Sequence, residues 1–487
     1  MRLSAISDTA LDLFRSTEAA VSDVVTPSLR LGVTGLSRAG KTVFITALVH
    51  TLTNACASPS LPLEHLRGFR AFLEPQPDDD VPRFAYEQHL KMLQNDIADW
   101  PESTRQISQL RLTLEWEASD TLRRLAGLPR RLHVDIIDYP GEWLLDLGLL
   151  SQSYQTWSRE INAAATRRLP DECTKTWLSF IHSRSMYDLS DEQIAIEGAQ
   201  KFTHYLRSLK EHNRYAQFIS PGRFLLPGEF EGSPLLTFFP LSIVSKIDEP
   251  VRPGTLGALL SKRFESYKQQ VVRPFFERHF KSLDRQIVLV DVLGALNGGA
   301  EAIEELETTL LGALQTFRPG RQSWLGRLIE RRIERVMFAA TKADLIHGSN
   351  HHRLNDLIRV LLSRAMKRVD ATGADVDVTS LASLRATEDV EYNNGRFSIP
   401  CIRGQPKVGE ISAGRLFNGQ SMAAIFPGDL PDDAYDIFDK DIFQAGALQF
   451  VRFQPPRPEY THLAKTPQWP HIGLDRIVRY LIGDRLT

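Results

Sequence analysis

Apolar residues along this chain fall into short runs that predict buried strands, separated by segments whose apolar residues recur at helical spacing. The runs predict strands at 29–34, 107–117, 132–138, 285–292, 335–341 and near 376. The apolar segment Val43–Val49 predicts a helix directly after the first strand, and an apolar face over Leu474–Ile482 predicts a C-terminal helix. Strands that alternate with helices indicate an α/β fold built on a doubly wound sheet.

Four segments depart from this alternation and are predicted to be additions to the sheet domain. Residues 145–284 show helical patterns, including a capping-box sequence at Ser190–Gln193, and predict a helical insertion domain. The others are an N-terminal amphipathic helix at 1–28, a small helical insertion at 56–100 and a β-rich insertion at 388–470. The sheet domain is then predicted to comprise 29–144, 285–387 and 471–487.

Between the first strand and its helix lies the sequence Gly-Leu-Ser-Arg-Ala-Gly-Lys-Thr at 35–42, a complete GxxxxGK[ST] pattern. In such a loop, backbone N–H groups converge on phosphate oxygens, the lysine supplies a cation and the threonine hydroxyl coordinates Mg²⁺. Lys41 is therefore a predicted catalytic residue and Thr42 a predicted Mg²⁺ ligand. The predicted phosphate-binding residues are Ser37, Arg38, Ala39, Gly40, Lys41, Thr42 and Val43.

The strand at 132–138 ends in Asp138-Tyr-Pro-Gly141, a DxxG pattern. This pattern alone is weak, since Asp291–Gly294 matches it too, but the first copy ends the strand expected beside the phosphate-binding loop. In a nucleotide switch the aspartate reaches Mg²⁺ through water, and the glycine N–H senses the γ-phosphate. We assign these roles to Asp138 and Gly141, and a structural role to Asp291.

The strand at 335–341 ends in Thr341-Lys-Ala-Asp344, and this motif predicts which base is bound. A carboxylate at Asp344 accepts two hydrogen bonds from the N1–H and N2–H₂ edge of guanine, whereas adenine presents an unprotonated N1, an acceptor facing an acceptor. Lys342 is expected to lay its aliphatic stem over the base, and Thr341 replaces the more usual asparagine. The motif favours GTP over ATP.

The motifs resemble those of the G domains of small GTPases and Gα-type proteins. Their particular residues, GLSRAGKT, DYPGEW, TKAD and SLRAT, are similar to those of the YcjX-like family of bacterial P-loop proteins. The resemblance runs along nearly the whole chain. It implies a G-domain-like P-loop NTPase sheet with large insertions, GTP and GDP as ligands, and an association with stress responses.

The resemblance to G domains also implies a fifth motif at 381–387. The sequence evidence for this motif is weak, because the usual Ser-Ala-Lys is missing. A backbone N–H near Ala382 or Ser383 is expected to contact guanine O6, with Leu384 beside it. An ordinary junction between a strand and a loop explains the sequence at 381–387 nearly as well.

The first switch must be found by position, directly before the strand at 107–117. Thr104 is the candidate Mg²⁺ ligand there. Its neighbours Trp100, Ser103 and Arg105 are candidate nucleotide contacts, with the tryptophan as a stacking ring and the arginine on the phosphates. The alternative is a plain turn that enters a strand.

The residue after DxxG is Glu142, where many GTPases carry a water-orienting glutamine. A glutamate accepts a hydrogen bond from the attacking water, but when ionised it adds negative charge beside a phosphoryl group whose transition state needs charge neutralised. We therefore predict slow intrinsic hydrolysis, with Glu142 and Lys41 as catalytic residues. Arg38 and Arg105 are candidate cis arginine fingers, and Arg105 is included among the catalytic residues; an exposed surface arginine is the alternative identity of each.

Composition narrows the range of partners and locations. The formal net charge is −2, which gives no global electrostatic argument for nucleic acid as a partner. Three isolated cysteines indicate neither a disulfide framework nor a zinc site, and no apolar run approaches the roughly 18 residues that span a bilayer. We expect a cytoplasmic protein. The arginine-rich stretch 317–335 is interpreted as a solvated helix face, with contact to anionic lipid or nucleic acid as the alternative, so peripheral membrane contact stays open.

Three function classes remain after these observations. A GTP-hydrolysing switch is favoured. The alternatives are a nucleotide-regulated scaffold with negligible turnover and an ATP-using phosphotransferase. The TKAD motif argues against the phosphotransferase, because it favours guanine. Because the second switch runs directly into 145–284, contacts of the γ-phosphate at Gly141 are expected to move the helical insertion. That insertion is the predicted binding surface for a protein partner.

Overall fold

The computed structural model describes most of the chain: residues 26–35, 39–55, 61, 63, 66–95, 98–102, 106–118, 129–167, 172–212, 221–242, 252–317, 333–367, 374–393, 395, 397–439, 446, 448–456 and 469–486. The predicted N-terminal helix at 1–28 and the arginine-rich stretch 317–335 lie almost wholly outside these ranges. Five predicted site residues also lie outside them: Ser37, Arg38, Ser103, Thr104 and Arg105.

A seven-stranded sheet forms the centre of the molecule, in the order β2-β3-β4-β1-β5-β6-β7. Its strands are β1 (Ser28–Gly35), β2 (Arg70–Glu74), β3 (Ser108–Trp116), β4 (Arg130–Asp138), β5 (Arg285–Val290), β6 (Arg335–Thr341) and β7 (Asp375–Leu381). The five strands β4, β1, β5, β6 and β7 pair with their neighbours in parallel. The remaining pairs, β2 with β3 and β3 with β4, are antiparallel. The predicted α/β fold class, with a mostly parallel central sheet, is confirmed.

The edge strand β2 departs from a prediction, since the sequence at 56–100 favours a small helical insertion. In the structure β2 pairs with β3 from Arg70↔Glu115 to Glu74↔Arg111, and the helix α3 (Tyr86–Gln94) follows it. Five residues are too few for apolar periodicity to separate strand from helix. The hydrogen bonds that define β2 come from β3, which no local pattern reveals.

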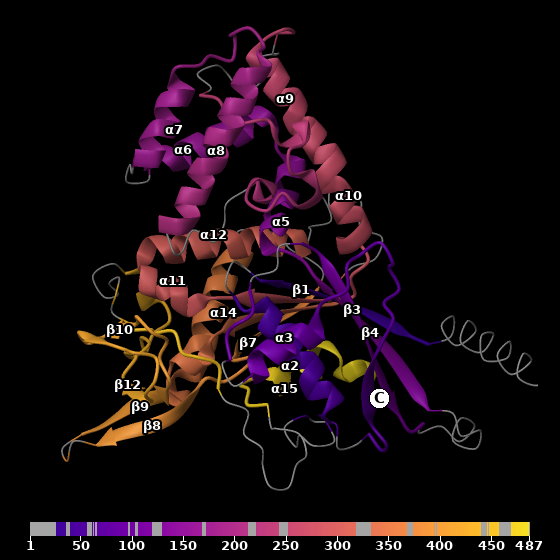
Figure 1. The fold of residues 1–487 in the computed structure, drawn as a ribbon, viewed down its shortest axis with the longest axis vertical. Coiled ribbons are helices and arrows are strands. Elements are labelled where there is room, and N and C mark those ends of the chain that lie inside the picture. The colour runs from indigo at the N-terminus through magenta and orange to yellow at the C-terminus, as the bar shows by residue number, and fades with distance from the viewer. Residues whose placement is uncertain are drawn as a thin grey trace, which may run out of the picture.

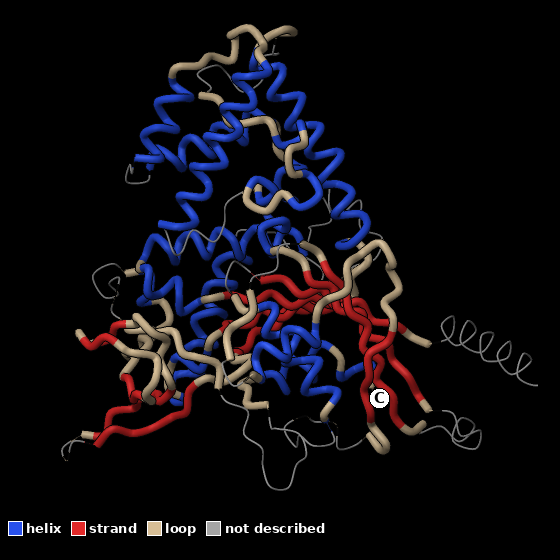
Figure 2. Tube along the Cα trace, viewed as in Figure 1, coloured by secondary structure: helices blue, strands red, loops and turns tan. Residues whose placement is uncertain are grey.

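Helices cover both faces of the sheet (Figures 1 and 2). On one face the core contains side chains of α2 (Lys41–Thr53), α3 and α15 (Leu474–Leu481). On the other it contains side chains of α11 (Val292–Gly298), α12 (Ala300–Phe317) and α14 (His351–Lys367). Because both faces are covered, β5 is buried along its whole length, which explains the apolar run from Ile287 to Val290.

A layer of helices stands above the carboxyl edge of the sheet (Figure 1), formed by α5 (Gly141–Leu145), α6 (Tyr154–Arg167), α7 (Glu172–His182), α8 (Glu192–His212), α9 (Leu256–Tyr267) and α10 (Arg273–Phe275). The 3-10 segment η2 (Asp146–Ser151) lies between α5 and α6, and the π-helical segments η6 (Lys268–Val272) and η7 (Phe276–Phe280) flank α10. Aromatic rings fill their core, and the rings of Trp157 and Phe264 stack with centroids 5.0 Å apart.

The start of α8 corrects the predicted capping box, in which Ser190 is the cap. The carboxylate of Asp191 instead accepts hydrogen bonds from the N–H groups of Gln193 and Ile194, at 2.7 and 3.3 Å. The N–H of Ser190 donates to Gly254 O at 2.9 Å, which ties this turn to the start of α9. The cap is therefore one residue nearer the helix than predicted.

A smaller β unit follows the sheet domain. It contains β8 (Thr387–Asn393), β9 (Ser398–Gly404) and β12 (Ala423–Ile425) in one antiparallel sheet, and the hairpin of β10 (Ile411–Ser412) and β11 (Arg415–Leu416). Single helical turns occur at η3 (Gly222–Phe224), η4 (Gly228–Phe230), η5 (Pro234–Leu236), η8 (Ala343–Leu345), η9 (Gly348–Asn350), η10 (Asp436–Phe438) and η11 (Gly483–Arg485). Trp100 Nε1 donates to Phe453 O at 2.8 Å, so the segment 448–456 that packs with this β unit contacts the residues before the predicted first switch.

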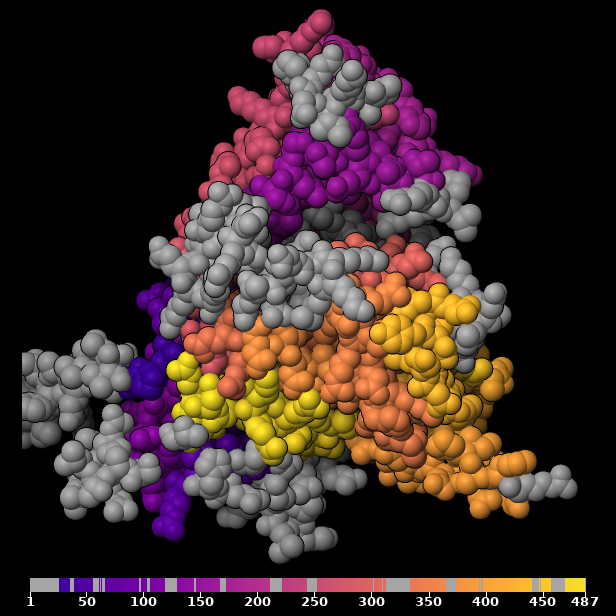
Figure 3. All heavy atoms as spheres, turned by 180° about the vertical axis from the view of Figure 1, so that it is seen from behind, coloured from indigo at the N-terminus to yellow at the C-terminus, as the bar shows by residue number. Residues whose placement is uncertain are grey.

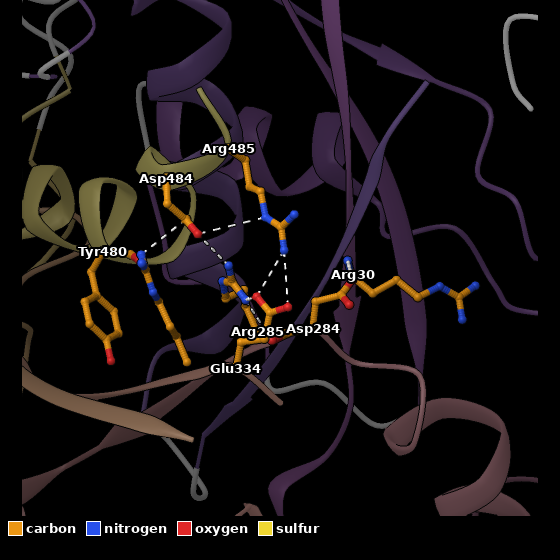
Figure 4. A network of polar contacts seen from close by, with 8 residues as sticks. Arg30, Asp284, Arg285, Glu334, Tyr480, Asp484 and Arg485 are labelled. Atoms are coloured by element: carbon orange, nitrogen blue, oxygen red, sulfur yellow. Dashed lines mark hydrogen bonds and ion pairs between the residues drawn. The ribbon is translucent and has the colours of Figure 1, made fainter. Parts of the chain in front are cut away.

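At the amino ends of the strands, a network of charges holds the C-terminal segment (Figure 4). Arg285, the first residue of β5, is only 1% exposed and pairs with Glu334 and with Asp484, the latter at 2.8 Å. The hydrogen bond from Arg285 is the main cause that lowers the pKa of Glu334. Figure 3, which shows the molecule from behind, has the C-terminal segment in yellow at the surface, below the helical insertion in magenta.

His50 of α2 gives a testable pH dependence of stability. Its ring lies against Trp469 with centroids 4.8 Å apart, and burial lowers its pKa from 6.5 to about 4. Its Nε2 has no hydrogen-bond partner among the described residues, so a proton there would be poorly solvated. The unfolded chain binds this proton near pH 6.5, so the contribution to stability is complete above that pH and is lost as the pH falls towards 4.

We expect this histidine to account for about 3 kcal/mol of unfolding free energy between pH 7 and pH 4. Urea unfolding of His50→Leu at several pH values should show a flatter profile in this window than wild type. The exposed His182→Gln serves as the control and should retain the wild-type slope. A slope in His50→Leu equal to that of wild type would contradict the assignment.

Candidate functional site

A cavity of about 680 Å³ lies at the carboxyl edge of the sheet, where the loops after β1, β6 and β7 meet. The phosphate-binding loop and α2 contribute Ala39, Gly40, Lys41, Thr42 and Val43, and the later loops contribute Thr341, Lys342, Asp344, Ser383 and Leu384. The wall is completed by Trp100, Pro101, Glu102, Glu142, Lys210, Leu226, Leu345, Ala382, Ala386, Lys407 and residues 451–453. The volume lies within the usual range of small-molecule and cofactor sites.

The phosphate-binding loop needs glycine at both of its consensus positions. Gly40 has φ 81°, in the left-handed region, and forms the cap from which α2 begins. A Cβ at Gly35 would lie 2.8 Å from Cγ of Lys41, so a side chain there would displace the lysine. The first turn of α2 contains no acidic residue, and its N–H groups and positive dipole end are suited to bind an anion.

Thr42 and Asp138 provide the oxygen atoms suited to a Mg²⁺ ion. Thr42 Oγ1 donates to Glu102 O at 3.3 Å, and Asp138 is paired with Val33 in the register of β4 and β1, at the ends from which the loops depart. Hydroxyl and carboxylate oxygens are ligands that Mg²⁺ prefers, with waters and substrate phosphates at its other positions. No group of three or more His, Cys, Asp or Glu suited to a metal occurs in the described ranges. The residues present therefore fit Mg²⁺ held jointly with a nucleotide.

Asp138 and Gly141 do not line the cavity as described. Asp138 is 1% exposed and Gly141 is buried, and neither is among the residues that line the cavity. Their assigned contacts with Mg²⁺ and the γ-phosphate stay predictions.

Asp344 lies at the other end of the cavity, in η8 directly after β6. One carboxylate oxygen accepts a hydrogen bond from the N–H of Ala386 at 2.9 Å, and its carbonyl accepts the hydroxyl of Thr387. These bonds join the TKAD motif to the predicted fifth motif. Burial raises the pKa of the Asp344 carboxyl above its usual range, with the Ala386 hydrogen bond opposing the shift. A ligand that donates two hydrogen bonds to this carboxylate would offset the cost of burying its charge.

Lys342 is held in place by Asp291, for which the sequence analysis predicted only a structural role. Its backbone has φ 62°, rare for a residue with a side chain, and its ammonium pairs with Asp291. Asp291 also caps α11 by accepting the N–H of Gly294 at 2.9 Å. Thr341, which replaces the usual asparagine, donates its hydroxyl to Val290 O at 3.3 Å and so braces this loop against β5.

An apolar wall stands beside this end of the cavity. Trp100 packs with Val43, Leu93 and Leu384, and Trp469 lies against the same cluster. Trp469 Nε1 donates to Ser383 O at 2.8 Å, which fixes the loop of the predicted fifth motif. Trp100, Ser383 and Leu384 thus meet in one cavity, as the predicted base contacts require.

Glu142, which follows DxxG, is paired with a cation that the sequence analysis missed. Lys210 Nζ of α8 lies 3.0 Å from Glu142 Oε1, and the side chain of Glu142 is only 7% exposed. The negative charge expected to oppose hydrolysis is therefore balanced by an ammonium from the helical insertion. The two residues lie 68 positions apart in sequence, so no local pattern signals the contact.

The helix α5 and the turn η2 that follow Gly141 are bonded to the helical insertion. Asp146 is buried and accepts the N–H of Gly222 at 2.7 Å and the hydroxyl of Tyr267 at 2.5 Å. Trp143 Nε1 donates to Leu226 O at 3.2 Å. A Cβ at Gly222 would lie 2.2 Å from the carbonyl oxygen of Glu142, so only glycine permits this approach. The segment from Gly141 to Ser151 and the insertion are therefore packed together.

Comparisons with known proteins agree with these motifs. The model of the YcjX-like family matches residues 29–486. A protein of Escherichia coli (strain K12) named Ras-like GTPase YcjX is 36% identical over 473 residues, covering 94% of this chain and 96% of its own. A protein of the same name from Shewanella oneidensis is 32% identical over 480 residues, covering 94% of each chain. None of the helices in the described ranges is both long enough and apolar enough to cross a membrane.

Proposed function

The chain belongs to the YcjX-like family, and from that premise we propose that it binds GTP and GDP with Mg²⁺ in the 680 Å³ cavity and hydrolyses GTP slowly. The observation that carries the proposal is the meeting of two distant motifs in this cavity. Lys41 and Thr42 line it at one end, and Lys342 and Asp344 line it at the other. The names of the two relatives, which describe those proteins as Ras-like GTPases, support the same function.

Each end of the cavity has its own part in binding. The start of α2 and Lys41 would bind the phosphates, as a helix N-terminus and a lysine do for anions elsewhere. Asp344 would accept N1–H and N2–H₂ of guanine, and Trp100 with Leu384 would pack beside the base. Thr42 and Asp138, with Thr104 of the first switch, would hold Mg²⁺, which when bound neutralises phosphate charge.

In the proposed reaction water attacks the γ-phosphorus, the bond to the β–γ bridging oxygen breaks, and GDP, inorganic phosphate and a proton leave. Glu142 would accept a hydrogen bond from that water, and Lys41 would stabilise charge on the phosphates. Arg38 and Arg105 lie outside the described residues and stay candidate fingers. The slow rate is a proposal supported by the glutamate at the position of a usual glutamine.

The switch itself would couple the γ-phosphate to the helical insertion. Gly141 begins α5, and α5 with η2 is bonded to the insertion through Asp146 and Trp143. A displacement of Gly141 on loss of the γ-phosphate would therefore act on the insertion, which we propose as the binding surface for a protein partner.

A competition titration tests the base preference. The ATP concentration needed to displace a fluorescent GTP analogue should exceed the GTP concentration by about 100-fold or more. Asp344→Ala should bind GTP much more weakly and lose the preference. Equal affinity of wild type for GTP and ATP would favour the ATP-using phosphotransferase instead.

Phosphate release in the same samples separates the switch enzyme from the scaffold. We expect GTP turnover on the order of 10⁻⁴ to 10⁻² s⁻¹, the range of G proteins without an activating partner. GTP binding with phosphate release equal to a Lys41→Ala blank would favour a nucleotide-regulated scaffold.

A further inference from the structure

Lys210 is a cation that the helical insertion supplies to the cavity. It lies near the end of α8, which runs from the top of the insertion towards the sheet (Figure 1). Its side chain is 32% exposed, and the residue lines the same cavity as Lys41 and Thr42. The helix thus adds an ammonium from the insertion to a cavity that is lined mostly by residues outside the insertion.

The partner of Lys210 locates it within the cavity. Nζ lies 3.0 Å from Oε1 of Glu142, the residue next to the predicted γ-phosphate sensor Gly141. Asp344, which is expected to bind the base, lies at the opposite end. An ammonium held beside Glu142 is therefore at the end where the last phosphate of a bound triphosphate would lie.

Other cations in the wall have different surroundings. Lys342 pairs with Asp291 at the base end, Lys407 pairs with Asp99, and Arg452 pairs with Glu410 in the β unit. Lys210 differs because its carboxylate partner belongs to the second switch. The ammonium has three N–H donors, and the bond to Glu142 needs one of them.

We propose that Lys210 is a catalytic residue of the proposed GTPase, a cis-acting finger that donates a hydrogen bond to a γ-phosphate oxygen as negative charge moves during hydrolysis. The inference rests on the proposed function. Glu142 holds the ammonium in position, and the remaining donors contact the phosphate while water attacks and the bond to the bridging oxygen breaks. Hydrolysis then depends on the helical insertion being packed against the second switch.

Lys210→Ala tests the proposal, with Lys201→Ala as the matched control. Lys201 lies on the same helix and pairs with Glu197 at 3.5 Å, outside the cavity wall. Single-turnover hydrolysis of GTP should fall about 100-fold or more in Lys210→Ala, with the affinity for GDP within about threefold of wild type. Lys201→Ala should match wild type, and Lys210→Arg should retain an intermediate rate.

Binding of GDP with aluminium fluoride, which imitates the transferring phosphoryl group, separates catalysis from folding. Wild type and Lys201→Ala should form this complex, and Lys210→Ala should lose it while still binding GDP. A Lys210→Ala rate within threefold of wild type would overturn the proposal. So would a wild type that binds GTP yet neither hydrolyses it nor forms the fluoride complex. Failure of wild type to bind GTP would instead reject the proposed function.

Discussion

Asp344→Asn is expected to change the preferred base from guanine to xanthine, with GTP affinity lowered by about 100-fold or more and xanthosine triphosphate affinity raised. The side-chain amide oxygen can still accept the N–H of Ala386, which bonds Asp344 at 2.9 Å. The amide nitrogen then faces the base as a donor. Xanthine carries a carbonyl where guanine carries its amino group, so donor and acceptor match again.

Competition between GTP, xanthosine triphosphate and ATP measures this change. The same variant should be more stable than wild type without nucleotide, because burial raises the pKa of Asp344 and so makes its ionised form unfavourable. Since the folded pKa lies above the unfolded one, stability falls as pH rises through that interval, and Asp344→Asn should lack this fall. Unchanged GTP affinity in Asp344→Asn would show that the base is bound elsewhere.

Asp146→Ala should lower the unfolding free energy by about 3–5 kcal/mol, the largest stability effect expected near the site. The buried carboxylate accepts the N–H of Gly222 and the hydroxyl of Tyr267, at 2.7 and 2.5 Å. Its removal leaves both donors without this acceptor in a dry interior. The lost bonds are those that join η2 to the helical insertion.

Urea unfolding measures this loss, with Asp191→Ala as the control. Asp191 is an exposed cap of α8, and its removal should cost about 1 kcal/mol. Limited proteolysis in GDP and in a non-hydrolysable GTP analogue should give different patterns for wild type, and the difference should shrink in Asp146→Ala. Equal stability losses for the two variants would contradict the tight packing of η2 against the insertion.

The strands and the two ends of the cavity follow from the sequence because their signals are local. Residues 35–42 carry a complete motif, and residues 341–344 carry one that departs from the usual pattern only at Thr341; the chemistry of each depends on a few neighbouring groups. Strands buried on both faces contain apolar runs, such as Ile287–Val290 of β5. The parallel order then places the loops after β1, β6 and β7 at one edge.

Contacts between distant segments did not follow from the sequence. Lys210 reads as one more charged residue on an amphipathic helix until α8 is packed against α5, which brings it to Glu142. Asp291 reads as the end of an interior strand, and only the adjacent β6 places Lys342 beside it. The edge strand β2 likewise depends on β3 for its hydrogen bonds.

A structure of the chain with Mg²⁺ and a non-hydrolysable GTP analogue tests guanine-nucleotide binding most directly. We expect the guanine N1 and N2 atoms within hydrogen-bond distance of the Asp344 carboxylate, and the phosphates on Lys41 and the start of α2. The γ-phosphate should lie on the side of the cavity formed by Glu142 and Lys210. A nucleotide bound outside this cavity, or inside it with its base away from Asp344, would contradict the proposed function.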